Sequence, residues 1–416
     1  MTAGKERDYM KNYIITNGLV YDPQTGILEK RDLAVAEGKI VDAAEIANQP
    51  GTAVFDVDGA VVSPGLIDMH CHIYPMCGVA DKSMTLPTID GEAHMFRNGV
   101  TTAVDAGTCG CRDFFDFKER FIDRAKLRIL AFVNIAYGGM ASLPTELEPE
   151  NFFPETAAAI AREVPEVVGI KTAHYHVGKP FDEAHPAWAS VDAAVQAGEL
   201  AGKPVMADVQ PYLPGRSYED LILERLRPGD IHTHVYAQQF PVLDQFRNVQ
   251  SFMHQARNRG VLFDLGHGAG SFWFRNAVPA YEQGFYPDTL STDLYLDNID
   301  GPVFGLLNVM SKYLNIGMPL EEILYRTTRR PAEILGRAEL ASVSVGSPAD
   351  LAVLQLREGK FGFADSGNAR MDGNRMLECI LTIRDGELVY NPMAYGMADW
   401  KEAPESYWKA PGVIEL

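Results

Sequence analysis

Residues 63–72 read SPGLIDMHCH, and this stretch decides the fold that we expect for the chain. Its apolar residues, with Val61 and Val62 before them, predict a buried β-strand over 61–70. Side chains two residues apart on a strand point the same way, so His70 and His72 face one spot while Cys71 turns outward. Imidazole is a good ligand for zinc and similar divalent ions. We therefore predict a metal site at the end of this strand.

Further apolar runs follow this strand, and amphipathic helical patterns separate most of them. The runs lie at residues 101–107, 129–136, 167–174, 203–210, 230–235, 261–267 and 288–295. Strands that alternate with helices over about 270 residues fit an α/β fold of the (β/α)8 TIM-barrel type. A doubly wound open sheet is the alternative, but no GxGxxG follows the first strand.

The two ends of the chain share a different, β-rich pattern. Short segments with partial alternation and turn residues between them occupy 13–62, and similar segments return at 346–356 and 378–392. We expect both chain ends, 1–62 and 343–416, to build one small β-sandwich domain with a C-terminal extension. The barrel then spans 63–342.

Polar residues stand at the ends of almost all the predicted barrel strands. The active site of such a barrel lies at the carboxyl ends of its strands. Imidazoles and carboxylates are costly to bury there unless they are paired, so stability alone does not account for them. They are His70, His72, Lys171, Asp208, His232, His234, His267 and Asp293. We expect these side chains to converge on one site that binds a metal ion or moves protons.

Composition excludes several classes of function. The chain has 416 residues, 37 of them Lys or Arg and 56 Asp or Glu, which gives a formal net charge of −19. An acidic surface repels nucleic acid and anionic membranes, so we expect neither partner and a small-molecule substrate instead. We expect no transmembrane helix and no secretory signal. The five cysteines are too few for a disulfide framework, which favours the cytoplasm.

The stretch SPGLIDMHCH resembles the motif P-G-x-x-D-x-H-x-H of the amidohydrolase superfamily of metal-dependent hydrolases. The resemblance covers nearly the whole chain, because the split terminal β-domain and the strand order match too. GIKTAH, THVY, LFDLGHGAGSFWF and LSTDLYLDN resemble the ends of strands four, six, seven and eight in a dihydroorotase-like branch. That branch includes proteins labelled dihydroorotases or deacetylases, some of which hydrolyse acyl esters. The leading hypothesis is hydrolysis of an amide, cyclic amide or acyl ester of a small, carboxylate-bearing substrate.

The resemblance implies a set of metal ligands, residue by residue. His70, His72 and Asp293 would hold a first divalent metal, with zinc as the expected ion. Lys171, which CO2 converts to a carbamate, would bridge to a second ion bound by His234. An ammonium cannot bind a cation, whereas a carbamate supplies two anionic oxygens. The alternative is that Lys171 is an ordinary salt-bridged lysine of the barrel.

One position departs from the family pattern. Members with two metals usually place a histidine at the end of strand five, where this chain has Asp208. A carboxylate can ligate zinc, so we expect Asp208 to take that place. Otherwise the second metal is weak or absent, leaving one ion per chain. A further alternative is that His232 supplies the imidazole, because His232 and His234 share one face of a regular strand.

The mechanism that we expect follows from the resemblance. A bound metal lowers the pKa of a water molecule towards about 7. Asp293 takes the proton of this water and later delivers it to the leaving group. His267, between two glycines, donates a hydrogen bond to the substrate, unless it is only a satisfied loop histidine. From their predicted loop positions, the candidates for binding the substrate are Tyr137, Tyr175, His176, Arg216 and Arg275. His174, in the same loop as His176, either lines the pocket or is only a surface polar group.

Two other functions stay open. A deaminase of the same superfamily usually uses one metal, without the carbamate lysine and with a strand-five histidine; Lys171 and Asp208 argue against it. A catalytically silent scaffold generally loses several ligands, whereas this chain keeps most of them. The sequence does not resemble that of a serine hydrolase, because it contains no GxSxG motif. Homo-oligomers are common among such barrels, but the sequence does not decide the oligomeric state.

Overall fold

A parallel sheet forms the centre of the molecule. The computed structural model describes residues 12–75, 86–175, 180–209 and 215–403. The sheet has the strand order β14-β13-β12-β11-β10-β9-β8, and all neighbouring strands run parallel. Its strands are β8 (Leu66–Cys71), β9 (Val100–Gly110), β10 (Arg128–Asn134), β11 (Val167–Ala173), β12 (Val205–Asp208), β13 (Ile231–His232) and β14 (Leu262–Phe263).

The segment 289–294 lies between the two edges of this sheet. Thr289 pairs in parallel with Asp264, just after β14, and Leu294 pairs in parallel with Cys71 of β8. Backbone hydrogen bonds at both sides accompany these pairs. A parallel sheet that is bridged at both edges in this way fits a TIM-type barrel.

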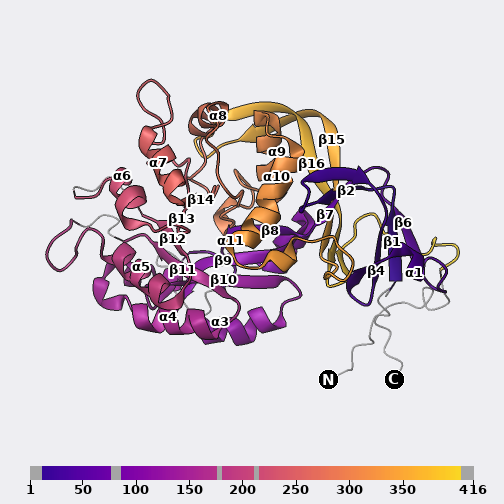
Figure 1. Cartoon of the computed structure of the whole chain (residues 1–416), viewed down its shortest axis with the longest axis horizontal. Helices are drawn as coiled ribbons and strands as arrows, with labels where there is room; N and C mark the ends of the chain where they lie inside the picture. Colours follow the sequence, from indigo (N-terminus) through magenta and orange to yellow (C-terminus); the bar gives the residue numbers. More distant parts are fainter. Residues whose placement is uncertain (1–11, 76–85, 176–179, 210–214, 404–416) are drawn as a thin grey trace.

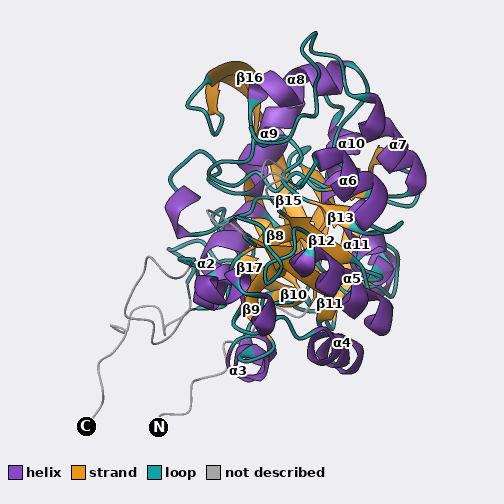
Figure 2. Cartoon of the chain, turned by 90° about the vertical axis from the view of Figure 1, so that its left-hand side faces the viewer, coloured by secondary structure: helices purple, strands orange, loops and turns teal. Residues whose placement is uncertain are grey.

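Helices cover the outer face of the parallel sheet, as Figure 2 shows. The helices between β8 and the terminal strands are α2 (Gly91–Met95), α3 (Phe114–Arg120), α4 (Pro154–Glu163), α5 (Ala189–Ala201), α6 (Tyr218–Asp220), α7 (Ser251–Arg259), α8 (Phe274–Glu282), α9 (Leu306–Ile316), α10 (Leu320–Thr327) and α11 (Arg329–Ile334). Helix α4 begins with Pro154 at its first position, where proline has no hydrogen bond to lose. Helix α5 ends at Gly202, which adopts the left-handed conformation typical of a C-cap. No helix among the described residues is long and apolar enough to cross a bilayer.

Strands from both chain ends share one sheet of order β17-β16-β15-β7-β2-β3, and a second sheet has the order β5-β4-β1-β6. In Figure 1 the indigo and yellow strands of the two ends lie together beside the helices. The strands are β1 (Asn12–Thr16), β2 (Leu19–Asp22), β3 (Ile27–Lys30), β4 (Leu33–Ala36), β5 (Lys39–Val41), β6 (Ala53–Asp56), β7 (Val61–Pro64), β15 (Leu351–Ala364), β16 (Arg370–Arg384) and β17 (Glu387–Tyr390), with the short helix α1 (Ala43–Ile46). Tyr13, Phe55, Val353 and Leu381 belong to one apolar core between these strands.

The predicted strand over 61–70 is in fact two strands. β7 pairs with β15 in the terminal sheet, whereas β8 opens the parallel sheet. Gly65 lies between them, and a Cβ there would overlap the side chain of Thr101. Only glycine lets the chain pass this close, so the motif residue before β8 is also where the chain leaves one sheet for the other.

The hairpin of β15 and β16 is longer than the sequence pattern predicts. Its turn reaches the loop that follows β14. The amide of Ser366 donates to the carbonyl of Phe272 (2.9 Å), and the amide of Phe274 donates to Asp365 Oδ2 (3.0 Å). The terminal sheet therefore supports a loop at the carboxyl end of the parallel strands.

Candidate active site

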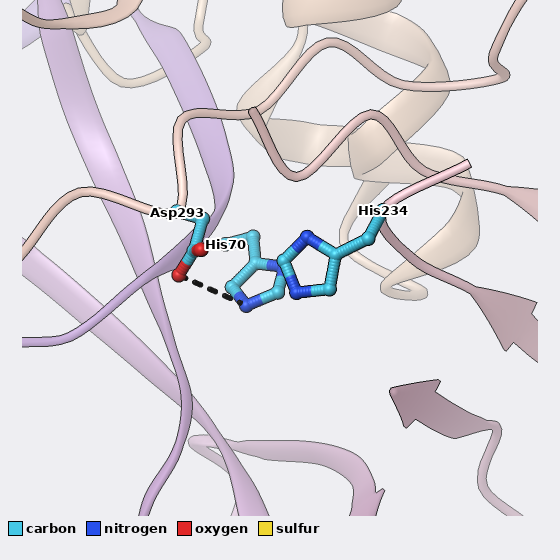
Figure 3. Close-up of side chains that lie close together, drawn as sticks. All are labelled: His70, His234 and Asp293. Atoms are coloured by element: carbon cyan, nitrogen blue, oxygen red, sulfur yellow. Dashed lines mark ion pairs between the residues drawn. The ribbon is translucent and has the colours of Figure 1, made fainter. Parts of the chain in front are cut away.

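Metal-ligating side chains from separate strand ends meet at the carboxyl end of the parallel sheet. His70 lies in β8, His234 follows β13, and Asp293 lies in 289–294; one ligand atom of each lies within 4.8 Å of the others. Figure 3 shows their side chains turned toward one another. Oδ1 of Asp293 is 3.5 Å from Nε2 of His70 and 3.0 Å from Nε2 of His72. The structure thus brings together four residues that the sequence predicts as ligands.

Hydrogen bonds behind two of the imidazoles determine which ring nitrogen faces this cluster. The hydroxyl of Thr233 donates to Asp264 Oδ2 (2.8 Å), so it accepts from Nδ1 of His70 (2.9 Å). The carbonyl of Gly266 can only accept, and it lies 2.7 Å from Nδ1 of His234. In the neutral imidazoles, Nε2 therefore presents a lone pair to the cluster.

This donor set fits a divalent cation. Nε2 of His70 lies 3.5 Å from a carboxylate oxygen of Asp293, and Nε2 of His234 lies 3.1 Å from a carboxylate oxygen of Asp208. Lone pairs that face carboxylates at these distances repel one another unless a proton or a cation lies between them. Imidazoles and carboxylates are also the ligands that zinc prefers beside thiolates.

Burial and neighbouring charges separate the pKa values of these imidazoles. Burial, followed by the charge of Lys171, holds the pKa of His70 well below its ordinary value. Burial also opposes a charge on His234, but the Asp208 carboxylate outweighs it and raises the pKa of His234 to about 9. His70 is therefore neutral, as a metal ligand must be, and a metal at His234 has to displace a proton.

Lys171 is completely buried beside the cluster. Its Nζ lies 3.3 Å from Nε2 of His70 and 3.6 Å from Sδ of Met206. None of the described residues forms a salt bridge with Lys171. The structure therefore does not support the alternative that Lys171 is an ordinary salt-bridged lysine of the barrel. Burial lowers the pKa of Lys171, which favours the neutral amine. Gly107, with φ 82°, gives the lysine its room, since a Cβ there would lie 2.5 Å from Cβ of Lys171.

The structure separates the two candidates for the missing strand-five imidazole. Asp208 ends β12 and faces His234 across 3.1 Å. Strand β13 ends at His232, and His234 has φ 63°, so the two histidines do not share a face. The ring of His232 packs instead against Tyr218 and Phe240, with centroids 5.1 and 4.5 Å away. The alternative that His232 supplies the missing imidazole does not fit this geometry, because the strand is not regular there.

A cavity of about 200 Å³ opens at the cluster. Its wall is largely polar, and it includes both carboxylates of the site. The lining residues are His70, His72, Leu86, Met140, His174, Asp208, His234, Gln239, Ala269, Gly270, Ser271, Asp293 and Tyr295. The sequence leaves open whether His174 lines the pocket or is a surface polar group, and in the structure it lies in this wall.

His267 does not lie in the described cavity wall. It is fully buried; Nδ1 lies 2.9 Å from the carbonyl of Gly268, and Nε2 lies 2.7 Å from Nζ of Lys312. Both ring nitrogens are therefore engaged inside the protein. The predicted hydrogen bond from His267 to a substrate does not fit this arrangement, because a buried lysine on α9 occupies the nitrogen that would make it.

The other predicted substrate contacts also lie outside the described cavity wall. The guanidinium of Arg216 stacks on aromatic rings, among them Tyr175 at 5.3 Å, and that of Arg275 lies 4.6 Å from the ring of Trp273. Tyr137 lies under the guanidinium of Arg112. His176 lies outside the described residues. Loop position alone did not predict where these side chains point.

Two buried carboxylates that the sequence analysis passed over support the site. Asp68 accepts from the amide (3.0 Å) and the hydroxyl (2.6 Å) of Thr292, next to Asp293, and burial raises the pKa of Asp68 to about 7. Asp264 accepts from three hydroxyl groups, including that of Thr233, which contacts His70. Both residues lie inside sequence motifs that carry the resemblance, and this position could have drawn attention to them. Their hydrogen-bond partners are distant in the sequence, so their supporting role could not be predicted.

Several known proteins are similar to this chain over most of its length. No family model matches the chain. A protein named deacetylase from Brucella anthropi is 30% identical over 364 residues, which cover 86% of this chain and 86% of that protein. The chain belongs to the amidohydrolase superfamily. Within this superfamily, a solved adenine deaminase matches with TM-score 0.79 and 26% identity, covering 92% of this chain and 100% of that one. A solved dihydroorotase matches with TM-score 0.78 and 26% identity, covering 92% and 98%.

As a member of the amidohydrolase superfamily, the chain is a hydrolytic enzyme. A metal-dependent hydrolase of amide or ester bonds fits both these relatives and the clustered imidazoles and carboxylate.

Proposed function

We propose that the chain hydrolyses an amide, a cyclic amide or an acyl ester of a small, carboxylate-bearing molecule. One observation carries the proposal: ligand atoms of His70, His234 and Asp293 lie within 4.8 Å of one another, beside a cavity of about 200 Å³. Such a cluster suits a divalent metal, and a cavity of this size admits only a small substrate.

Two groups of residues are proposed to hold zinc or a similar divalent ion. The first group is His70, His72 and Asp293, and the second group is Lys171 as its carbamate, Asp208 and His234. A bound metal supplies a water molecule of lowered pKa and polarises the substrate carbonyl. The short contacts between imidazole Nε2 atoms and carboxylate oxygens support both groups.

Carbamylation of Lys171 is proposed because burial lowers the pKa of this amine and so favours its neutral form. Burial lowers its pKa, and a neutral amine can add to CO2 with loss of a proton. The product carries two anionic oxygens, which can reach two cations. The absence of a salt bridge to Lys171 among the described residues supports this proposal.

Asp293 is the proposed acceptor of the proton that the attacking water loses. Its amide donates to the carbonyl of His70 (2.6 Å), and its own carbonyl accepts from Nδ2 of Asn298 (2.7 Å). These bonds hold the backbone on both sides, so the carboxylate stays between the cluster and the cavity. A general base requires such fixed placement within hydrogen-bond reach of its proton.

A deaminase is the second candidate, since the solved adenine deaminase aligns over 92% of this chain. Lys171 and Asp208 argue against it, because the resemblance implies that a deaminase of this superfamily usually has one metal, a strand-five histidine and no carbamate lysine.

The proposed function is tested by metal content and by a panel of esters and amides. Purified protein is loaded with zinc, with and without bicarbonate, and metal per chain is measured by elemental analysis. Two metals, a bicarbonate requirement and turnover of an ester or amide support the proposal. Asp293→Asn should retain metal while turnover falls by about 1000-fold. Failure to bind metal, or full activity of D293N, contradicts it; one metal without bicarbonate dependence indicates a mononuclear site.

Further proposals concern the domain architecture, the binding partners, the cellular location and the oligomeric state. We propose that 288–295 serves as the eighth strand of a (β/α)8 barrel over 63–342, supported by its bonds to both sheet edges. We propose a terminal β-sandwich from 1–62 and 343–416, supported by the pairing of β7 with β15. The net charge of −19 favours a small-molecule substrate over nucleic acid or membranes, and the few cysteines favour the cytoplasm. A sizing measurement will decide whether the chain forms a homo-oligomer.

A further inference from the structure

His174 lies in the cavity wall, immediately after β11. Its neighbour Ala173 is in register with Asp208 on β12, so the imidazole projects from the strand end beside the proposed second metal group. The side chain is 39% exposed, in contrast to the buried imidazoles of His70 and His72. His174 is therefore a histidine of this site that a bound substrate can reach.

Glu146 orients this imidazole. Glu146 lies in the 3-10 helical segment η4 (Gly139–Leu147) and is 1% exposed. Its Oε2 lies 2.7 Å from Nδ1 of His174, and its Oε1 accepts from Nδ2 of Asn134 (2.7 Å). Asn134, at the end of β10, also donates to the carbonyl of Gly107 (3.0 Å) and is thereby fixed.

This chain of bonds leaves one ring nitrogen for the cavity. A carboxylate accepts hydrogen bonds, so Nδ1 of His174 donates to Glu146. Nε2 then has no hydrogen-bond partner within the described part of the chain. A histidine held by a carboxylate through one nitrogen, with the other nitrogen open to a pocket, is the arrangement that proteins use for proton transfer.

The backbone of His174 supports the same assignment. Three residues of the cavity wall that are not glycine have positive φ angles: 54° at His174, 63° at His234 and 48° at Asp293. L-residues rarely adopt this conformation, and where they do, it commonly marks a functional site. His234 and Asp293 are proposed metal ligands, so His174 shares its strained conformation with two residues that are proposed to bind the metal.

We propose that His174, oriented by Glu146, is a catalytic residue that protonates the leaving group. This inference rests on the proposed hydrolase function. After the water oxygen has added to the acyl carbon, the bond from that carbon to the leaving oxygen or nitrogen breaks. Its electron pair stays on the leaving atom, which takes the proton from Nε2. Solvent returns a proton to the imidazole. Asp293 does not deliver the water's proton to the leaving group, as the resemblance implies, but releases it to solvent, so one water is consumed.

The charge on Glu146 suits this role. Burial opposes a charge on His174, but the adjacent carboxylate outweighs it and raises the pKa of His174 above its ordinary value. The imidazolium is therefore favoured before the bond breaks, and the carboxylate keeps the ring in place after the proton has left.

The test is the dependence of rate on the leaving group. Zinc-loaded enzyme is given esters of one acid with phenols of decreasing acidity, together with the matching methyl ester and amide. A good leaving group departs without a proton, whereas an alkoxide or an amine needs one. His174→Gln should reduce kcat for the methyl ester and the amide by about 100-fold, and should hardly change it for the most acidic phenol. Glu146→Gln should show the same trend with a smaller loss.

His185→Gln is the matched control. His185 also pairs with carboxylates, Asp182 and Glu148, but it does not lie in the cavity wall, so H185Q should match the wild type. Thermal unfolding shows that each variant is folded; if H174Q is not, E146Q carries the test. An equal loss for every leaving group, or no loss, overturns the role of His174. If the wild type hydrolyses no member of the panel, the proposed function itself fails, and this inference fails with it.

Discussion

The Nε2 atom of His234 lies 3.1 Å from Oδ2 of Asp208, across the ends of the neighbouring strands β13 and β12. Burial raises the pKa of the Asp208 carboxyl, but the charge of His234 outweighs burial and holds this pKa well below its ordinary value. In the proposed second metal group, a carboxylate thus stands where the resemblance implies an imidazole, and it would give this group one more negative charge.

Removing this carboxylate should empty the second metal group. We expect Asp208→Ala to lower affinity for the second ion by at least about 100-fold, so that metal content falls from two ions per chain to one. Asp208→His, which restores an imidazole, should keep two ions. Elemental analysis after dialysis measures both variants. If D208A retains two ions, Asp208 is not a ligand.

Loss of the hydroxyl of Thr233 should weaken metal binding without touching a ligand. This hydroxyl joins Nδ1 of His70 to Oδ2 of Asp264, and valine has the same shape without it. We expect Thr233→Val to lower metal affinity by about 10- to 100-fold. The free energy of unfolding should fall by about 1–3 kcal/mol, because two buried groups lose a partner.

Thr172→Val is the control for this substitution. The hydroxyl of Thr172 is buried and has no hydrogen-bond partner among the described residues. Its loss breaks no hydrogen bond, so it should not lower the free energy of unfolding and should leave metal affinity unchanged. Competition with a chelator and urea unfolding measure both variants; equal effects would contradict the role of Thr233.

Substitution of Gly107 should displace Lys171. A Cβ at Gly107 would lie 2.5 Å from Cβ of Lys171, and the φ of 82° is itself unfavourable for alanine. Gly202→Ala provides the comparison, because Gly202 has a similar φ of 65° but nothing within 4 Å of its Cβ position. We expect G107A to lose most activity and more stability than G202A. Equal melting temperatures and activities would show that the close approach to Lys171 is unimportant.

The buried amine of Lys312 should make stability depend on pH. Burial lowers the pKa of Lys312 to about 7 from its ordinary value of 10.5, although Asp365 opposes this shift. Between these values the unfolded chain binds a proton that the folded chain does not, so wild-type stability rises with pH. Relative to Lys312→Met, it should rise by at most about 1.4 kcal/mol per pH unit above pH 7 and stay constant below. Urea unfolding at several pH values measures the difference; parallel curves for the two proteins contradict the shift.

Local patterns predicted the parts of the site that belong to regular strands. His70 and Lys171 lie where the sequence places them, because alternation along a strand depends on neighbouring residues alone. The short strands of the terminal sheet could also be predicted from the sequence, since turn residues separate them. The division of the strand at Gly65 was not, because it depends on how closely Thr101 approaches.

Irregular positions could not be read from the sequence. His232 and His234 would share a face on a regular strand, but β13 ends at His232. His267 stands between glycines as a substrate contact would, yet Lys312 reaches it from a helix 45 residues away. Glu146 carries no local motif, and only the fold brings it to His174.

The sequence by itself determined which side chains of this protein stand at the strand ends, and therefore that it would gather imidazoles and carboxylates at one rim. The periods of strands and helices depend only on residues that are close in the chain, so they can be recognised in the sequence. Only the tertiary structure decided which of these side chains turn into the cavity. The left-handed backbone at His174, His234 and Asp293 is held by contacts with segments distant in the chain, which no local pattern records.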